Sequence, residues 1–208
     1  MRLLKFDEEL RVRHQVVHLA GADEAGRGPL AGPVVAAAVV LDGTPRRELR
    51  GVKDSKILTA QIREQLFTVI RRCSVRWAVA WAGPEEIDRH NILRASLLAM
   101  RRAFQRLRLE GTDVVLAVDG PHCVPGLPCR QEAVVDGDAR SLCIASASIL
   151  AKVVRDRWME RLHRVYPGYG FAAHKGYGTP EHLEALSRLG PSPIHRRSFE
   201  PVARLLRA

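Results

Sequence analysis

The sequence is poor in aromatic residues, in closely spaced cysteines and in long apolar runs. Phe, Trp and Tyr together make up 5% of its 208 residues. Its four cysteines, at positions 73, 123, 129 and 143, form no C-x₂-C pair, so neither a zinc site nor a redox dithiol is indicated. The longest apolar run, 34–41, is far short of the ~20 residues that a membrane-spanning helix needs. We therefore expect a protein without membrane spans whose thiols stay reduced.

Two nucleotide-binding motifs and a secretion signal are also missing. The sequence has no G-x-x-x-x-G-K-[ST] loop, so nothing in it supports an NTPase site. Residues 26–32 are one position off the G-x-G-x-x-G fingerprint and lead into a β-branched strand rather than a helix, which excludes a dinucleotide site. The first fifteen residues mix charges throughout and lack the apolar core of a secretory signal. The expected location is the cytoplasm.

Positive charge is what the sequence has in excess. It contains 33 Lys and Arg against 23 Asp and Glu, a formal net charge of +10. Such an excess favours a polyanionic partner, most simply nucleic acid. A basic protein that is merely well solvated would show the same balance, so the charge does not decide between the two.

The spacing of apolar residues predicts strands early in the chain and helices later. Strands are expected at 16–24, 34–41, 75–82 and 114–118, the first two as an antiparallel pair. Helices are expected at 58–71, 91–109, 139–165 and 179–189, with Thr59 and Thr179 as N-caps. This order indicates an α/β fold with a helical C-terminal part.

Carboxylates stand at the ends of several of these elements. Asp23 and Glu24 end the first strand, Asp119 ends the fourth, and Asp138 precedes the long helix. Each has an ordinary explanation: an acidic pair entering solvent, an Asp-Gly turn, a helix N-cap. Their number in a chain of charge +10 favours a site for Mg²⁺ or Mn²⁺, which prefer oxygen ligands. Two such ions ~4 Å apart can drive phosphodiester hydrolysis.

The acidic pair carries a geometric condition. Neighbouring residues on a regular strand point to opposite faces. Asp23 and Glu24 can therefore serve one site only if the strand bends or ends there.

Two loops carry residues suited to nucleic acid. Residues 53–56 put two lysines and Ser55 in a turn before a helix, which suits phosphate contacts as well as an ordinary solvated cap. Residues 166–178 interleave aromatics with cationic side chains on a glycine-rich loop, which suits stacking on a sugar or base. For Tyr166 and Phe171 packing on the core is the preferred interpretation.

Seven segments together resemble bacterial ribonuclease HII. They are GADEAGRGPLAGPVV (21–35), KDSK (53–56), DRHNILRAS (88–96), VDG (118–120), GDARSLCIASASILAKVVRDR (137–157), HKGYGT (174–179) and HRRSF (195–199). Each is weak alone, and seven in the right order are specific. Residues 1–15 lie outside the resemblance and have no assigned role. Residues 16–208 are expected to form one catalytic domain whose helical C-terminal part begins near residue 158.

The resemblance implies a ribonuclease H-like fold, with a central mixed β-sheet flanked by helices and a helical C-terminal extension. It implies an endoribonuclease that hydrolyses the RNA strand of RNA–DNA hybrids. It also implies cleavage on the 5′ side of a single ribonucleotide embedded in duplex DNA, leaving a 3′-hydroxyl and a 5′-phosphate, and so a role in removing ribonucleotides from DNA. Nothing in the sequence demands a partner chain, so a monomer is expected.

The family's functional residues map onto matching positions of this sequence. Those that match metal-binding carboxylates, for two Mn²⁺ or Mg²⁺ ions, are Asp23, Glu24, Asp119 and Asp138. Those that match the loop sensing the ribose 2′-hydroxyl are Gly26, Arg27 and Gly28. Tyr177 matches the tyrosine that stacks on the next sugar. Those that fall in segments associated with phosphate or substrate contacts are Lys53, Ser55 and Asn91.

Elementary chemistry agrees with this mapping. The 2′-hydroxyl is what lets a protein tell RNA from DNA, and glycine lets backbone approach it closely. The small residues at 145–148 are expected to pack their helix closely on the sheet and so to hold Asp138 near the other carboxylates. The basic residues Arg196, Arg197, Arg204 and Arg207 either contact DNA or are solvated.

Three rival interpretations are weighed against this one. Ribonuclease HIII shares the fold, but its usual N-terminal substrate-binding domain is not expected within the fifteen residues before Val16. A non-catalytic nucleic-acid-binding module explains the basic charge but not the carboxylates at element ends. A DNA transposase or resolvase on the same fold needs DNA-joining partners that this chain does not show.

Overall fold

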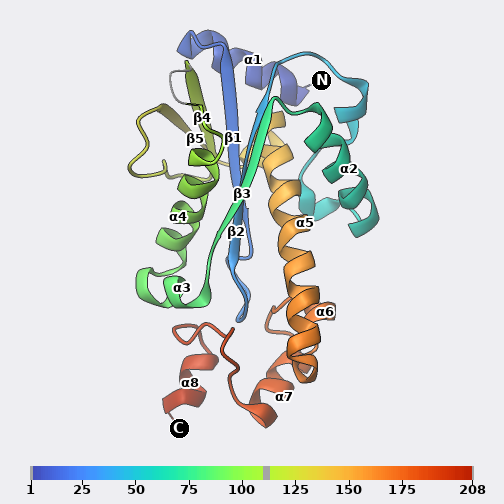
Figure 1. The fold of residues 1–208 in the computed structure, drawn as a ribbon, viewed down its shortest axis with the longest axis vertical. Helices are drawn as coiled ribbons and strands as arrows, with labels where there is room; N and C mark the ends of the chain where they lie inside the picture. The colour runs from blue at the N-terminus through green and yellow to red at the C-terminus, as the bar shows by residue number, and fades with distance from the viewer. Residues whose placement is uncertain (1, 110–112, 208) are drawn as a thin grey trace.

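A mixed five-stranded sheet forms the centre of the computed structural model, which describes residues 2–109 and 113–207 (Figure 1). Its strands are β1 (His18–Ala25), β2 (Val34–Leu41), β3 (Arg76–Ala82), β4 (Val114–Asp119) and β5 (Arg130–Val134). Their spatial order is β3-β2-β1-β4-β5. The pairs β1–β2 and β2–β3 are antiparallel, whereas β1–β4 and β4–β5 are parallel. The predicted antiparallel pair and the predicted mixed sheet are both confirmed.

Helices cover both faces of the sheet and extend beyond one end of it (Figure 1). They are α1 (Arg2–His14), α2 (Ala60–Cys73), α3 (Pro84–His90), α4 (Ile92–Gln105), α5 (Leu142–Val165), α6 (Phe171–His174), α7 (Pro180–Leu189) and α8 (Val202–Arg207). Helices α2 and α5 lie on one face, with α1 across its end, and α3 and α4 lie on the other. Helices α6 to α8 form the C-terminal part below the sheet, as predicted.

The alternation of side chains along β1 divides the interior into two cores. Leu19 packs with α2 and α5, whereas Ala20 and Ala22 pack with α3 and α4. Every residue of β2 is buried, which explains its uninterrupted apolar sequence, since a strand covered on both faces does not alternate.

Helix α5 lies very close to the sheet because of a glycine in β1. A Cβ on Gly21 would overlap the backbone of Cys143 and Ile144. The four small residues that follow, 145–148, are all buried. The predicted close packing of this helix on the sheet is confirmed, and it fixes where the segment just before α5 lies.

The helix caps match the sequence in two places and differ in a third. Thr59 accepts from the N–H of Ile62 and Thr179 from the N–H of His182, as predicted. Helix α5 begins at Leu142 instead of Ala139, because Ser141 provides its N-cap. The alternative explanation of Asp138 as the helix N-cap is therefore wrong: Asp138 lies in the 3₁₀ turn η3 (Gly137–Ala139).

The predicted helix at 91–109 is too long at its C-terminal end, and it follows a helix that was not predicted. Helix α3 starts with Pro84 at its first position, and the Glu86 carboxylate accepts from the N–H of Gly83. Helix α4 ends at Gln105 because its last turn tightens. The N–H of Arg108 donates to the carbonyl of Gln105, and Arg108 has a positive φ of 52°, where the helix cannot continue.

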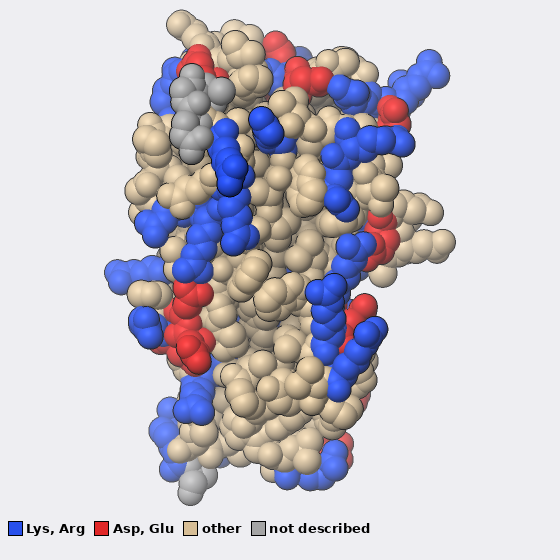
Figure 2. Space-filling view, viewed as in Figure 1, with Lys and Arg blue, Asp and Glu red and all other residues tan. Residues whose placement is uncertain are grey.

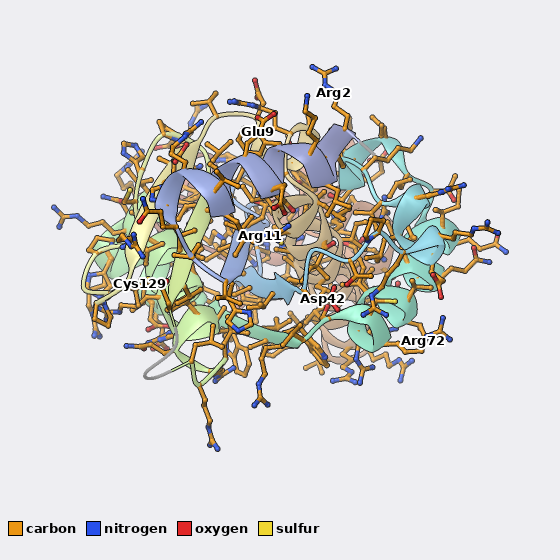
Figure 3. The ribbon with its side chains drawn as sticks, turned by 90° about the horizontal axis from the view of Figure 1, so that it is seen from above. Arg2, Glu9, Arg11, Asp42, Arg72 and Cys129 are labelled. Atoms are coloured by element: carbon orange, nitrogen blue, oxygen red, sulfur yellow. The ribbon has the colours of Figure 1, made fainter. Side chains whose placement is uncertain are left out.

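Four further helices and strands were not predicted: β5, α1, α6 and α8. Strand β5 is short and mostly half-buried, so it lacks the apolar alternation that identifies a strand. Helix α1 lies where the sequence shows only mixed charges. It packs on the start of α5, where Asp7 accepts from the N–H of Cys143 at 3.0 Å. Figure 3 shows Arg11 pointing from α1 toward the loop after β2.

Two arginines, one in α4 and one just after it, close the exposed edge of the sheet. Arg102 donates to the carbonyl of Trp81 and Arg106 to that of Val79, at 2.9 and 2.6 Å. Both acceptors lie on the edge strand β3, and occupying such an edge prevents it from pairing with another chain.

Figure 2 shows Lys and Arg along both flanks of the face that is turned to the viewer in Figure 1, with a largely uncharged band between them. Part of the positive charge is therefore structural.

We propose that residues 16–208 form a single domain, because α5 contacts the sheet at one end and α6 at the other. The predicted start of the C-terminal part near residue 158 lies beside Met159, which belongs to a separate apolar cluster with Tyr169 and Phe171. Among the described residues, none of the helices is long and apolar enough to cross a membrane.

The Asp7→Asn variant is expected to gain stability over the wild type as pH rises. Burial raises the pKa of Asp7 from its ordinary 3.8 to about 6. The folded state therefore favours the protonated acid, and this advantage, complete below pH 3.8, is lost as pH rises through 6. At ~1.4 kcal/mol per pKa unit, the loss is on the order of 3 kcal/mol.

Urea unfolding of both proteins between pH 4 and pH 7 measures this difference. Asn keeps an oxygen for the N–H of Cys143 and brings no charge into the interior. Parallel stability curves for the two proteins would contradict a desolvated carboxylate at this position.

Candidate active site

Four carboxylates predicted from the sequence gather around the ends of β1 and β4. Asp23 and Glu24 belong to β1, and Asp119 is the last residue of β4. The parallel register pairs Ala22 with Val118, so Asp119 stands level with Asp23 on the neighbouring strand. Asp138 follows β5 in the turn η3, where the N–H of Gly137 donates to Asp119 at 2.8 Å. This bond holds Asp119 next to the turn that carries Asp138.

Burial and like charge act together on this group. Burial raises the pKa of Asp23 well above its ordinary value, and repulsion from Glu24 and Asp119 raises it further. Burial also raises the pKa of Glu24, an effect that Arg27 opposes and Asp119 strengthens. Burial raises the pKa of Asp119 too, with a contribution from Asp138. Without a cation among them, these carboxylates hold their charge unfavourably.

The geometric condition on the acidic pair is met because β1 ends at Ala25, one residue after Glu24. Strand β1 stays regular through both residues, which pair with Ala37 and Ala36 of β2. Asp23 shares the face of Leu19, which packs with α5, and Glu24 points to the other face. Asp119 nevertheless interacts electrostatically with both. The site therefore lies at the end of the sheet, where side chains from either face can reach it.

The segment 53–56 supplies a buried hydroxyl and a cation. Ser55 is 4% exposed and forms a 2.9 Å hydrogen bond with Ser148 of α5, which in turn bonds Asp23. The structure thus places Ser55 behind a carboxylate, away from the surface on which a phosphate would lie. The Lys56 ammonium lies 3.1 Å from Asp138 and partly balances the acidic group.

The other two residues assigned loosely to substrate are exposed. Lys53, the first residue of this segment, lies on the surface. Asn91 caps α4, accepting from the N–H of Arg94 at 3.0 Å. The structure thus gives Asn91 a local structural contact, and a phosphate contact remains a prediction for Lys53 and Asn91.

Two buried arginines hold the glycine-rich loop that follows β1. Arg196 is 0% exposed and donates to the carbonyls of Gly26 and Arg27 at 2.6 and 2.7 Å. It also donates to the carbonyl of Gly32 at 3.0 Å. Burial, and then repulsion from Arg155, lowers the pKa of Arg196 to about 9, so it remains a cation at neutral pH.

Arg155 supports the same loop from α5. It is also 0% exposed, and it donates to the carbonyls of Pro33 and Ala31 at 3.1 and 3.3 Å. Gly26 has φ +96°, and a Cβ there would overlap the Arg155 side chain. Glycine is therefore required at this position by both conformation and space.

Tyr177 lies against the same loop. A Cβ on Gly28 would stand 3.6 Å from the Tyr177 ring, and the N–H of Leu30 donates to the carbonyl of Gly176 at 2.8 Å. The Tyr177 side chain is 45% exposed. The structure therefore brings together the two recognition elements that the sequence places about 150 residues apart, a separation that local patterns cannot bridge.

Comparisons with known proteins decide the family. A family model for ribonuclease HII matches residues 20–202. The chain belongs to the ribonuclease HII family. A ribonuclease HII from Acidovorax sp. (strain JS42) is 57% identical over 190 residues, covering 91% of this chain and 88% of that protein.

Solved structures agree with this ribonuclease HII assignment. The ribonuclease H2 of Pyrococcus horikoshii OT3 is 32% identical with a TM-score of 0.76, covering 90% of this chain and 96% of the other. Bst-RNase HIII, solved with Mn²⁺, is 19% identical with a TM-score of 0.76, covering 92% of this chain and 70% of the other, and so shares the fold. The protein is a type 2 ribonuclease H, an endoribonuclease acting on RNA–DNA hybrids, and the resemblance found in the sequence is confirmed.

The structural neighbour Bst-RNase HIII was solved with Mn²⁺, and the donor set of this chain fits a divalent metal. All four predicted ligands offer carboxylate oxygens, which hard cations prefer. Among the residues that the structure describes, no three Asp, Glu, His or Cys side chains already stand at metal-ligand spacing. Asp138 instead contacts Lys56, and Glu24 contacts Arg27. These carboxylates have to turn from their cationic neighbours to bind a metal.

Several residues that shape the ribonuclease HII site were not identified from the sequence. Arg155 was not singled out, Arg196 was expected to contact DNA or be solvated, and Ser148 appeared only as a small packing residue. The one signal for them is that all three fall inside segments that resemble the family. Arg197 and Arg204, from the same basic C-terminal set, are exposed as expected, whereas Arg196 is buried.

The Arg196→Lys variant is expected to lose on the order of 3 kcal/mol of unfolding free energy. Lysine lacks the planar fork of arginine, so the buried carbonyls of Gly26 and Gly32 would lose donors. Urea unfolding measures the loss. The matched control is Arg197→Lys at the exposed neighbouring position, which should stay within ~0.5 kcal/mol. Equal losses in both variants would show that the buried guanidinium has no special role.

Proposed function

We propose that this ribonuclease HII hydrolyses phosphodiester bonds with two divalent cations, Mn²⁺ or Mg²⁺, held by its four clustered carboxylates. These are Asp23, Glu24, Asp119 and Asp138. When bound, such ions activate an attacking water and stabilise the leaving oxygen. The observation that carries the proposal is the acidic group at the ends of β1 and β4, in which Asp23 and Asp138 are buried and the carboxylates repel one another. The neighbour solved with Mn²⁺ supports manganese as one of the ions.

The residues of the chain prepare this site in three ways. Ser148, backed by Ser55, holds Asp23 in place. The N–H of Gly137 orients Asp119. Lys56 keeps one positive charge beside Asp138, so part of the negative charge of the carboxylates is balanced before metal binds.

In the reaction, water attacks the phosphorus, the bond to the 3′ oxygen breaks, and a 3′-hydroxyl and a 5′-phosphate result.

We further propose that the site selects a single ribonucleotide in duplex DNA and that the enzyme cuts the strand on the 5′ side of that ribonucleotide. The loop 26–28 follows directly from Glu24, and its backbone is pinned from behind by Arg196. Arg27 and Gly28 remain exposed, so their backbone is available to a 2′-hydroxyl, the group that marks RNA. The half-exposed Tyr177 ring beside Gly28 suits stacking on the next sugar. These features support a role in ribonucleotide removal from DNA.

One copy of the chain brings together the carboxylates, the loop 26–28 and Tyr177, which supports action as a monomer. All four cysteines are free thiols, as suits the reducing cytoplasm that the sequence predicts.

The direct test is cleavage of duplex DNA that carries one ribonucleotide, with Mn²⁺, Mg²⁺ or a chelator. We expect a metal-dependent cut on the 5′ side of the ribonucleotide. Cleavage of a long RNA–DNA hybrid alone would contradict the proposed junction recognition. Cleavage that continues in chelator would contradict the metal site.

Replacing Asp119 by Asn is expected to lower cleavage by at least about a thousandfold while hybrid binding is largely kept. The amide still accepts from the N–H of Gly137 but cannot contribute a charge to the metal. Gel-based cleavage rates and hybrid affinity, measured side by side, check both parts. Full activity in this variant would remove Asp119 from the mechanism.

The Tyr177→Ala variant is expected to lose about tenfold or more in cleavage at a single ribonucleotide, with a smaller loss on a long hybrid. Its ring is 45% exposed, so little packing should be lost with it. The two cleavage rates and the thermal midpoint are compared with those of the wild type. A fall in thermal stability that matches the loss on both substrates would indicate a tyrosine needed only for folding.

A further inference from the structure

Two buried histidines lie directly behind Tyr177, and the proposed mechanism does not use them. His182, in α7, is 0% exposed, and His195, in the segment before α8, is 2% exposed. Both rings pack against Phe171, at centroid distances of 5.4 and 5.7 Å. Buried polar groups need defined hydrogen-bond partners, and these partners form one continuous chain.

The chain of hydrogen bonds runs from Ser192 to the backbone of Tyr177. The backbone nitrogen of Ser192 lies 3.0 Å from His195 Nδ1, and the Ser192 hydroxyl oxygen lies 2.8 Å from the same atom. His195 Nε2 lies 3.1 Å from His182 Nε2, and His182 Nδ1 lies 2.8 Å from the carbonyl oxygen of Tyr177. The backbone groups at both ends have only one possible role each, and the Ser192 hydroxyl, which can donate or accept, adapts to the ring nitrogen that it faces.

These fixed ends determine both tautomers. Since a peptide N–H can only donate, Nδ1 of His195 accepts, and the proton of that ring is on Nε2. His195 therefore donates to Nε2 of His182, which leaves the His182 proton on Nδ1. That proton is donated to the Tyr177 carbonyl, which can only accept. A second proton on either ring would set two N–H groups against each other.

The surroundings keep both rings neutral. Burial, and then the neighbouring His182, lowers the pKa of His195 to about 4. Burial also lowers the pKa of His182. The chain of donors is therefore complete at neutral pH.

A third histidine fixes the same loop from its other end. The N–H of Gly176 donates to His174 Nδ1 at 3.2 Å, so His174 donates from Nε2 to the carbonyl of Tyr169 at 2.7 Å. The His174 and His182 rings stack, with centroids 4.5 Å apart and planes at 12°. The backbone on either side of Tyr177 is thus held by imidazoles of defined tautomer.

His195 also links this loop to the one that follows β1. Its chain neighbour Arg196 binds the carbonyls of Gly26 and Arg27. Ala31 forms an isolated β-bridge with His195, and the N–H of Arg196 donates to the carbonyl of Leu30 at 2.9 Å. Two consecutive residues therefore support the two loops that meet at Gly28 and Tyr177.

We propose that His182 and His195 are positioning residues that set the place of Tyr177 relative to the loop 26–28, and thereby the preference for a single ribonucleotide. This inference rests on the proposed function of Tyr177. The histidines act through the Tyr177 backbone and make no contact of their own with substrate.

The first test is spectroscopic and independent of activity. Nitrogen-15 NMR of the imidazole rings in the wild-type protein at pH 7 should show His182 protonated on Nδ1 and His195 on Nε2. Either ring in the opposite tautomer, or exchanging between tautomers, would overturn the chain of hydrogen bonds whether or not the enzyme recognises a junction.

The second test compares two variants at one position. His182→Leu removes the donor to the Tyr177 carbonyl, whereas His182→Asn keeps an amide N–H close to the place of Nδ1. The measured quantity is kcat/KM on duplex DNA with one ribonucleotide divided by kcat/KM on a long RNA–DNA hybrid. We expect this ratio to fall about tenfold in His182→Leu, as the loss of one hydrogen bond predicts, and to be largely restored in His182→Asn.

Met100→Ala in the α4 core is the matched control, since Met100 is 2% exposed and packs in the core on the opposite face of the sheet. It should lose thermal stability while keeping the wild-type ratio.

An unchanged ratio in His182→Leu, or the same fall in Met100→Ala, would overturn the positioning role. If His182→Leu does not fold, a wild-type ratio in a folded His182→Asn together with the predicted tautomers supports the proposal, and a tenfold fall in that variant contradicts it. A wild-type enzyme that cuts hybrids but shows no cut at a single ribonucleotide contradicts the role of Tyr177 itself, whatever the tautomers.

Discussion

The burial of two guanidinium groups without carboxylate partners is the constraint on which the rest of the site depends. Arg155 and Arg196 are both 0% exposed, and their hydrogen-bond acceptors are backbone carbonyls of the segment 26–33. Bringing an ion into a protein interior costs several kcal/mol unless its donors are satisfied. The segment therefore has to keep its carbonyls turned inward, and this fixes the loop that follows Glu24. The C-terminal helical part, which contributes Arg196, is thus required for the site near the sheet.

The buried arginines are stabilised by hydrogen bonds, whereas the carboxylates are held by the fold where they repel one another. Gly21 lets α5 approach β1, and Ser148 of that helix then bonds Asp23. The raised pKa values of Asp23 and Asp119 mean that packing energy elsewhere offsets an unfavourable cluster. Such trade-offs between stability and function are usual at active sites. A divalent cation would reverse the sign of the interaction, so the geometry that destabilises the metal-free state is the one that favours metal.

Sequence reasoning found the groups whose position follows from local pattern. Asp23 and Asp119 end apolar strands, and Thr59 and Thr179 precede helices, so neighbouring residues reveal them. Strand β5 escaped detection because only one of its five residues is buried, and α4 stopped early through a backbone turn at Arg108 that side-chain periodicity does not encode. Ser55 and Arg196 were placed on the surface since their partners, Ser148 and Gly26, lie 93 and 170 residues away.

Long-range contacts that the sequence does not reveal also limit what the net charge says about binding. Arg102 and Arg106 donate to carbonyls at the edge of β3, and Arg155 and Arg196 donate to carbonyls of an internal loop. At least four of the 33 basic residues are therefore engaged by the protein's own backbone. Each still adds a positive charge to the chain, although Glu86 pairs with Arg102 at 2.7 Å. The formal charge of +10 therefore measures the long-range field that attracts a polyanion, but it overstates the number of side chains free to contact one. We therefore expect specificity to come from the few groups near the carboxylates, where Tyr177 and Gly28 meet.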